Sequence, residues 1–458
     1  MAANRGVGRL LGALGLGAML WSALPAAAQT PAAPAAAPGP ASKEALRSQY
    51  DALFQQILRN PADIDATLRF AEVATQLGEY EAAIGALERI LFYNVQLPRV
   101  HLELGILYFR LGSYEIAREH LRTAISGKDV PEEVRRRVDE FLAEAERRLS
   151  PSQLSAEVRF GLRHQSNANV APLGNTYRVY GLDLDLPDDA KKRPDWNFFV
   201  QGSAHHIYDL HTQTGDTIET NLQLYQALQF KETRYDLGLV ELDTGPRFVL
   251  TTEGLRTTLR PYVLGNYVEL AHTRYLTSFG GGVSMAFYFS PAITAEARIE
   301  YRNRDFNNSK KNPAVSFQSG DIATPSWTMQ ARLSDDISVL GRVLFGSNRA
   351  DQAYYSYNLY QGDLSLTWSF DAGLGLPGKV SLTPFASYIA TNYRAPDPVF
   401  DPTVKRRDRE WQVGASIDVP VMEHIGTFAQ LFYSTIDSSL PNFQSRNFAV
   451  SFGVSVKF

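Results

Sequence analysis

Residues 153–458 alternate between apolar and polar side chains with the period of two that a β-strand produces. The last run, 445–458, shows the alternation most clearly, and its apolar positions are Phe448, Val450, Phe452, Val454, Val456 and Phe458. About fourteen such runs follow one another, beginning with 154–163, and residues that favour turns separate them. A strand in a soluble sandwich can alternate in the same way, so the pattern alone leaves both readings open. The number of runs predicts an antiparallel transmembrane β-barrel of about 14 strands.

The lengths of the connections predict how the barrel is oriented across the membrane. The long connections are 164–195, 305–326 and 390–410, and they follow runs one, seven and eleven. Tight turns at 290–292 and 334–336 follow even-numbered runs. Because outer-membrane barrels have longer loops outside than in the periplasm, the odd-to-even connections are expected outside the cell. An even strand count then places both ends of the barrel in the periplasm.

Residues 43–150 have a helical pattern that repeats every 34 positions. The matched positions are Gly78 and Gly112, Tyr80 and Tyr114, Ala83 and Ala117, and Ala71 and Gly105. This period, with small residues and tyrosines at fixed offsets, resembles the tetratricopeptide repeat, a helix-turn-helix unit. We expect these residues to pack the repeats together, with 131–149 as a capping helix. Such a solenoid usually binds a peptide or partner protein, and the alternative is a rigid periplasmic spacer.

The first 28 residues have the features of a secretory signal peptide. Arg5 and Arg9 precede an apolar run at 10–24, and small residues lead to a cleavage site between Ala28 and Gln29. The run is shorter than the ~20 residues that a transmembrane helix needs. Residues 29–42 are rich in alanine and proline, which predicts a flexible linker. The sequence therefore predicts export, a linker, a periplasmic domain at 43–150 and a barrel at 153–458.

Composition narrows the range of functions. The formal net charge of −4 gives no reason to expect a nucleic-acid partner, and the absence of cysteine excludes thiolate metal sites and cysteine nucleophiles. His205 and His206 are adjacent on a predicted strand, so they face opposite sides and cannot readily share a metal. The glycines 373, 375 and 378 match a dinucleotide-binding pattern but lie between two strands, which favours a turn. We expect neither a cofactor nor enzymatic activity.

The closing aromatics also carry an expectation. A chain that stops on an aromatic of the apolar face resembles the closing strand of bacterial outer-membrane barrels. In those proteins the terminal aromatic is part of the signal read by the barrel assembly machinery. The resemblance implies that Phe448, Phe452 and Phe458 close the barrel and act as an assembly signal. It also implies that the barrel meets the lipids of the outer membrane.

A signal peptide, a short repeat domain and a barrel together resemble the surface lipoprotein assembly modulator family. The stretch 158–172, Val-Arg-Phe-Gly-Leu-Arg-His-Gln-Ser-Asn-Ala-Asn-Val-Ala-Pro, is similar to the opening of that family's barrel. The resemblance implies an outer-membrane translocator that delivers lipoprotein or secreted protein cargo to the cell surface. The repeats would then engage the cargo or a periplasmic chaperone. A polysaccharide exporter and a porin-like channel are the alternatives.

Overall fold

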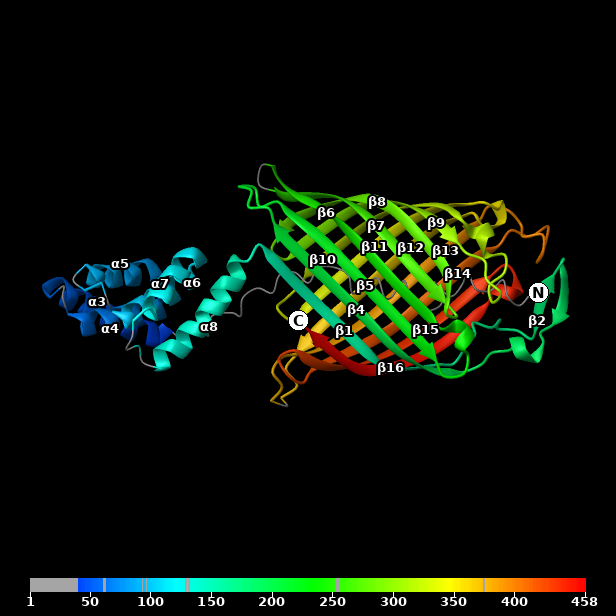
Figure 1. Cartoon of the computed structure of the whole chain (residues 1–458). Helices are drawn as coiled ribbons and strands as arrows, with labels where there is room; N and C mark the ends of the chain where they lie inside the picture. Colours follow the sequence, from blue (N-terminus) through cyan, green and yellow to red (C-terminus); the bar gives the residue numbers. More distant parts are fainter. Residues whose placement is uncertain are drawn as a thin grey trace. The chain divides into compact units, whose positions relative to one another are not determined.

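The computed structural model describes residues 40–458, apart from 61–62, 93, 96, 128–129, 131, 253–254 and 374. The expected signal peptide, its cleavage site and most of the expected linker lie outside these residues. The chain divides into two compact units, with the boundary between Gln153 and Leu154. The first unit is helical and the second is a barrel of strands (Figure 1). The expected fold class, a short helical repeat unit followed by an antiparallel barrel of about 14 strands, is confirmed.

Six helices form the described part of the first unit. They are α3 (Pro40–Arg59), α4 (Ile64–Leu77), α5 (Tyr80–Leu91), α6 (Pro98–Arg110), α7 (Tyr114–Ala124) and α8 (Glu132–Leu149). Helix α3 begins three residues inside the expected linker, because proline fits the first turn of a helix, where an N–H would have no intrahelical partner. None of the helices in the described residues is both long and apolar enough to cross a bilayer.

Two glycines end the first helix of each repeat in the same way. Gly78 follows α4 with φ 82°, and Gly112 lies two residues after α6 with φ 78°, so both occupy the left-handed region. After α4, the Gly78 N–H donates to a carbonyl in the last turn of the helix (3.1 Å) and the Glu79 N–H donates to a second one (2.8 Å). The Gly112 and Ser113 N–H groups make the same two bonds at 3.0 and 2.9 Å. The helix caps therefore recur with the same 34-residue period as the sequence pattern.

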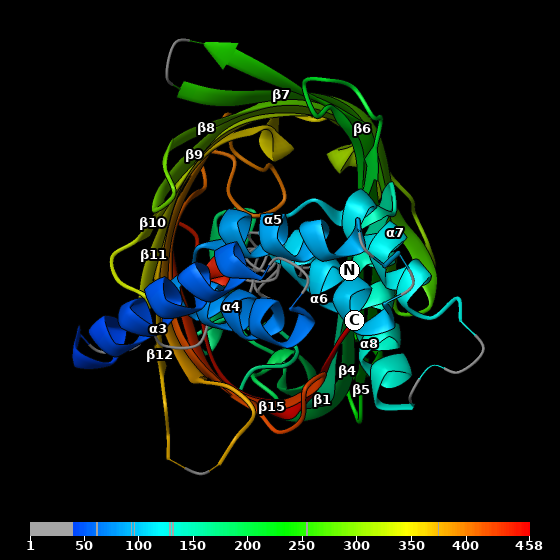
Figure 2. The same ribbon diagram turned by 90° about the vertical axis from the view of Figure 1, so that its left-hand side faces the viewer.

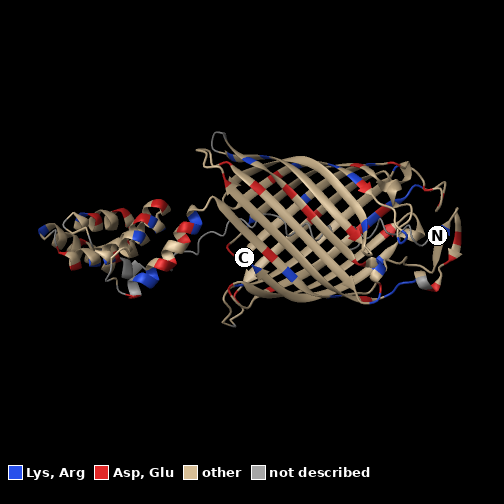
Figure 3. Cartoon of the chain, in the orientation of Figure 1, with Lys and Arg blue, Asp and Glu red and all other residues tan. Residues whose placement is uncertain are grey.

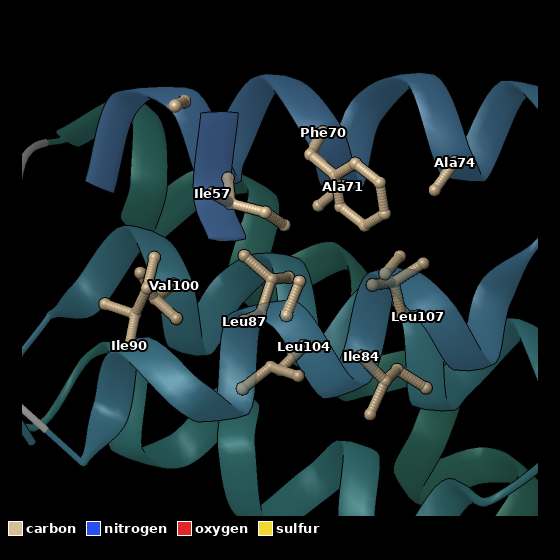
Figure 4. Close-up of a cluster of buried hydrophobic side chains, with 13 residues drawn as sticks. Ile57, Phe70, Ala71, Ala74, Ile84, Leu87, Ile90, Val100, Leu104 and Leu107 are labelled. Atoms are coloured by element: carbon tan, nitrogen blue, oxygen red, sulfur yellow. The ribbon is translucent and has the colours of Figure 1, made fainter. Parts of the chain in front are cut away.

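Small residues let the paired helices approach. Ala83 of α5 and Ala117 of α7 are completely buried, one in each repeat. Phe70 of α4, Leu87 of α5 and Leu104 of α6 point into one apolar cluster that spans the two repeats (Figure 4). Burial of apolar side chains on this scale is the main source of stability for a unit this small.

Fourteen strands close into the barrel (Figure 2). They are β1 (Ser152–Gln165), β4 (Asp195–Asp209), β5 (Thr217–Gln229), β6 (Leu237–Thr252), β7 (Leu255–Leu270), β8 (Thr273–Ser290), β9 (Ile293–Phe306), β10 (Gly320–Arg332), β11 (Ile337–Ala350), β12 (Tyr357–Phe370), β13 (Val380–Tyr393), β14 (Arg407–Pro420), β15 (Ile425–Ser438) and β16 (Ser445–Lys457). Each barrel strand lies between its neighbours in sequence, and β1 pairs antiparallel with β16 to complete the ring.

The β1–β16 seam is a regular ladder. Its register runs from Glu157 opposite Lys457 to Gln165 opposite Ala449. Phe458 extends the ladder, because its backbone exchanges two hydrogen bonds with Ala156, at 2.9 and 3.2 Å. In a bilayer, a barrel must close in this way because no water is present to satisfy an open strand edge.

The two mouths of the barrel differ. At the mouth where β1 begins and β16 ends, here called the terminal mouth, the connections are short, and the longest spans residues 371–379. At the opposite mouth, the loop mouth, residues 166–194, 307–319 and 394–406 form the long connections after β1, β9 and β13. The three long connections expected from the sequence therefore lie at one mouth. Strand β10 begins at Gly320, seven residues earlier than expected, which shortens the second connection.

The first long loop contains a hairpin that sequence periodicity did not predict. Strands β2 (Thr176–Val179) and β3 (Leu182–Asp185) pair outside the barrel. Tyr180 and Gly181 connect them with φ 52° and 81°, as a two-residue turn of type I′ requires. Four-residue strands are too short to give a recognisable alternation, and tyrosine is not a residue that favours this turn.

Gly105 gives a test of the repeat packing. A Cβ at this position would lie 2.7 Å from Cγ of Leu121, whereas a Cβ at Gly85 of α5 would meet nothing within 4 Å. We expect Gly105→Ala to lower the free energy of unfolding of the helical unit by about 1–3 kcal/mol. The control Gly85→Ala should raise it by up to about 1 kcal/mol, because alanine favours a helix. Thermal unfolding followed by the helical circular dichroism signal measures both, and equal effects of the two changes would contradict the packing assignment.

Candidate functional site

The outer surface of the barrel is apolar. Phe279, Ile299 and Val343 are 68%, 65% and 60% exposed, and they lie at outward positions of β8, β9 and β11. The tryptophans of the barrel strands are all exposed; they are Trp196, Trp327, Trp368 and Trp411. A closed antiparallel barrel with an even strand number and an outward apolar surface is the architecture of outer-membrane proteins. The sequence-based expectation of an outer-membrane location is in keeping with this surface.

The inner wall carries charged side chains in pairs. Glu219 of β5 forms ion pairs with two arginines, Arg247 at 2.5 Å and Arg260 at 3.7 Å. Arg260 also contacts Asp243 of β6 at 2.5 Å, and its side chain is only 3% exposed. These groups come from three neighbouring strands, so they form a lattice across the wall. Figure 3 shows charges of both signs along the barrel strands.

The lattice continues over β6 and β9. Arg302 of β9 contacts Glu241 of β6 and Glu300 of its own strand, both at 2.5 Å. Glu300 accepts a hydrogen bond from the Tyr262 hydroxyl at 3.0 Å, and the Arg298 guanidinium lies 5.7 Å from the centre of the Tyr262 ring. Each arginine of this region therefore faces a carboxylate or an aromatic ring. Removing one partner of such a pair usually costs about 3–5 kcal/mol, because the other charge stays buried.

A second group of arginines crosses the inner side of the seam. Arg159 of β1 contacts Asp418 of β14 at 2.8 Å, although β15 and β16 lie between these strands. Arg163 donates to Ser451 of β16 and to the Tyr225 hydroxyl of β5, both at 3.0 Å. Side chains on the inner face of β16 are small, which leaves room for these long arms. The arginines thus tie the two ends of the sheet together from inside.

Near the loop mouth the inner wall becomes apolar, and two loops pack against it. Val315 lies in the connection after β9 and is 3% exposed within a cluster of inward side chains that includes Tyr275 and Phe306. Val170, from the connection after β1, packs against the same cluster. The loops therefore share a core with the barrel wall.

Two asparagines fix the start of the first loop. The Asn167 amide donates to the Ala171 carbonyl (3.0 Å), and its oxygen accepts from the Ala171 N–H (2.9 Å). Its backbone N–H donates to the Asn447 side chain on β16 at 3.0 Å. The side chain of Asn169 holds the end of the loop. Its amide donates to the Lys191 carbonyl (2.7 Å), and its oxygen accepts from the Arg193 N–H (2.9 Å). Asn167 and Asn169, which lie within the stretch 158–172, therefore hold both ends of the first loop in place, and we call these two residues the asparagine clamp.

A further contact set holds the β2–β3 hairpin against other loops. The Tyr180 and Gly181 N–H groups donate to carbonyls in the connection after β13, at 2.8 and 2.9 Å. Arg178 makes two bonds to Asp183 across the hairpin, at 2.8 and 3.0 Å, which hold the pKa of that carboxyl below its usual value. Phe400, Leu440 and Phe443 form a small core beside it. The loop mouth is thus a folded layer.

The helical unit contains a polar cluster between its repeats. The Tyr108 hydroxyl donates to Glu88 at 2.6 Å, which raises the tyrosine pKa to about 12. His101 Nε2 lies 2.9 Å from the Val95 carbonyl, so it must donate there. His101 Nδ1 then accepts from His120 Nδ1 at 3.0 Å. Burial and the neighbouring His101 lower the pKa of His120.

The remaining sequence-predicted positions lie as follows. Phe448 and Phe452 are outward on β16, 45% and 44% exposed, and Phe458 is 73% exposed. Tyr80 and Tyr114 each begin the second helix of a repeat. The packing and closing roles expected of these residues, and the role of Phe458 as an assembly signal, stay predictions. The inner-wall arginines were not identified from sequence, although charged residues at every second position of 298–304, three of them arginines, were a usable signal.

Neither metal nor nucleotide chemistry gains support from the described residues. Within them, no three histidine, aspartate or glutamate side chains form a metal-binding group. His205 Nδ1 lies 2.6 Å from the Asn221 amide oxygen, so this ring nitrogen already has a hydrogen-bond partner. Gly373 and Gly375 have φ 67° and 64° in the connection between β12 and β13, where the structure has a turn rather than a helix.

The asparagine clamp can be tested by substitution. Asn167→Ala removes side-chain bonds to Ala171 and leaves a buried N–H and C=O without partners, which costs about 1–3 kcal/mol locally. We expect faster proteolysis within residues 173–191 while the barrel keeps its heat-modifiable gel mobility. Asn175→Ala, at an exposed position of the same loop, is the control. Equal cleavage rates in the two variants would show that Asn167 does not hold the loop.

The histidine cluster predicts a pH dependence of the helical unit. Because the pKa of His120 is lower in the fold than its usual 6.5, the unfolded chain binds the proton first as the pH falls. The stabilisation from neutral His120 is therefore present above about pH 6.5 and is lost as the pH falls through the folded pKa. Helical unfolding temperatures at about pH 7 and about pH 5 should differ less in His120→Gln than in the wild type. His211→Gln, in the exposed β4–β5 connection, should keep the full difference.

Comparison with known proteins gives a limited result. No family model and no curated protein matches the chain. Among solved structures, the Acinetobacter baumannii outer-membrane channel DcaP has a TM-score of 0.37 at 8% identity, covering 67% of this chain and 97% of that one. Pseudomonas putida OprB has a TM-score of 0.34 at 8% identity (67% and 94%). The Yersinia enterocolitica chaperone SycD has a TM-score of 0.21 at 16% identity (23% and 75%). These scores are low, so the fold assignment rests on the strand pairing and helix packing of the chain itself.

Proposed function

We propose that this chain is an outer-membrane transport protein that delivers lipoprotein or secreted protein cargo from the periplasm to the cell surface. The observation that carries the proposal is the direct fusion of a repeat unit to a membrane barrel. Only Ser150 and Pro151 separate helix α8 from strand β1. Anything bound by the repeats is therefore held at a high effective concentration at the barrel.

The orientation follows from the connections. Long loops gather at one mouth, and in outer-membrane barrels the longer loops are extracellular. The terminal mouth, and with it the helical unit, is then periplasmic. Helical repeats of this type commonly present a surface to an extended peptide. The unit carries exposed apolar side chains, Phe54, Leu58 and Ile116 among them, that suit a cargo segment or a chaperone.

Polysaccharide export is the second candidate, because the inner wall over β14, β15 and β16 carries uncharged polar side chains beside the carboxylates of β14. Its side chains, on β14, β15 and β16, are Gln412, Ser434, Asn447, Ser451 and Ser455. Hydroxyl and amide groups of this kind can bond to sugar hydroxyls. The paired charges on the opposite part of the wall are not specific to either cargo.

The test is cell-surface labelling of intact cells with and without the chain. A surface lipoprotein encoded beside this gene should become protected from external protease when the chain is deleted, and it should return with the full-length chain. A variant that lacks residues 40–149 but keeps the barrel should fail to restore exposure, because the repeats no longer recruit cargo. An unchanged surface proteome together with lost surface polysaccharide would favour the exporter.

A further inference from the structure

Four arginines lie at the loop mouth on the outward side of the barrel between β13 and β16. They are Arg394, just after β13, Arg407 and Arg409 of β14, and Arg446 of β16. Their orientation follows from strand alternation. Asp408, Glu410 and Asn447 are buried inward positions, whereas Trp411 and Phe448 are exposed outward ones. We call these four residues the arginine belt.

The arginines of the belt differ from those inside the barrel in their partners. Arg409 donates to the Asn392 amide oxygen at 3.0 Å and to the Asp408 backbone carbonyl at 2.8 Å. Arg394 donates to Ser347 at 3.0 Å and to Asn358 at 3.3 Å. These acceptors are neutral. They hold the guanidinium groups of Arg394 and Arg409 in place without an ion pair.

Among the residues that the structure describes, no ion pair joins the belt to a carboxylate. Asp437 lies directly opposite Arg409 in the β14–β15 register, and no ion pair forms between them. On the inner wall, by contrast, Arg302 and Arg342 each contact a carboxylate within 2.7 Å. Arg302 and Arg342 are thus paired with carboxylates, whereas the belt forms no ion pair within the described residues and is available to an external anion.

The belt also lies at a defined level. Arg409 and Arg446 precede Trp411 and Phe448 by two residues on their strands, and a strand rises about 3.4 Å per residue. Measured along the strand, the Cα atoms of these arginines therefore lie about 7 Å closer to the loop mouth than those of the outward aromatic residues. Aromatic residues mark the boundary between lipid tails and headgroups in membrane proteins. The belt is consequently placed at headgroup level on the loop-mouth side.

Outward arginines without a carboxylate partner are not a general property of the loop-mouth rim, as the other side of the barrel shows. Outward positions near the loop mouth on β7, β9 and β10 carry Glu269, Asp305 and Asp321. Two arginines lie beside them: Arg274 pairs with Asp305 at 2.6 Å, and Arg349 of β11 lies opposite Asp321 in the strand register. Apart from Asp437 of β15, the outward charges near the loop mouth are basic over β13–β16, whereas β7, β9 and β10 carry acidic ones. A second copy that presented the same basic face would be repelled, which argues against a symmetric dimer through the belt.

We propose that the arginine belt binds the phosphate groups of a phosphorylated glycolipid in the leaflet at the loop mouth. Guanidinium groups bind phosphate through paired N–H donors and keep their charge at any physiological pH. Adjacent strands are about 4.8 Å apart, so the belt can contact more than one phosphate of a single headgroup. The inference rests on the proposed function only for its orientation, which makes this leaflet the outer one.

The experiment uses the purified full-length chain in a zwitterionic detergent. The probes are lipid A with two phosphates, lipid A with one phosphate, and phosphatidylcholine, and native mass spectrometry measures the bound lipid. The test variant carries Arg394→Gln, Arg407→Gln, Arg409→Gln and Arg446→Gln. The matched control makes the same change in charge on exposed arginines of the helical unit, with Arg99→Gln, Arg110→Gln, Arg135→Gln and Arg136→Gln.

The wild type and the control should bind the doubly phosphorylated lipid most tightly, and more weakly as salt is added. Binding by the test variant should be at least about tenfold weaker, because it lacks the four cations that attract the phosphates of the headgroup. Equal binding by both variants, or binding independent of the phosphates, would overturn the proposal. So would a dimer that the test variant disrupts without any change in lipid binding.

Heat-modifiable gel mobility shows whether the test variant has folded. If it has not, the double change Arg407→Gln and Arg446→Gln, which leaves the neutral contacts of Arg394 and Arg409 intact, takes its place under the same criteria. The assay needs no cargo, and the surface-labelling test needs no purified lipid. Failure of one proposal therefore leaves the other open to its own result.

Discussion

Closure of the sheet by β1 and β16 is the constraint on which the barrel depends. A strand edge in a bilayer would leave backbone groups without partners, so the first and last strands must find each other across nearly the whole barrel sequence. Gly161 and Gly453 lie opposite each other in this seam, and a Cβ on either would approach a carbonyl oxygen of the other strand at 2.1 or 2.0 Å. Arg159 and Arg163 reinforce the seam from inside.

The same alternation that closes the barrel also separates two kinds of charge. Inward arginines such as Arg260 are nearly buried, and a charge there is tolerable only beside a carboxylate. Outward arginines of the belt sit at the rim, where water and headgroups can solvate them, so they need no protein partner. Buried Arg260 is thus paired with a carboxylate, whereas the arginines of the belt form no ion pair within the described residues.

Much of the architecture could be predicted because it follows from periodicity. The 34-residue offset between Gly78 and Gly112 and the alternation of 445–458 each specify a local structure directly. The β2–β3 hairpin could not be predicted in this way, because it is short and its turn uses Tyr180. The inner-wall lattice was missed for another reason: its partners, such as Glu219 and Arg260, lie on strands whose pairing only the folded barrel defines.

The asparagine clamp also has a consequence in time. Asn167 follows the first strand of the barrel, and its partner Asn447 belongs to the last, 280 positions later. Contacts between such distant parts of a chain form late, because the intervening segments must be in place first. The first long loop therefore becomes ordered only after the final strand has paired.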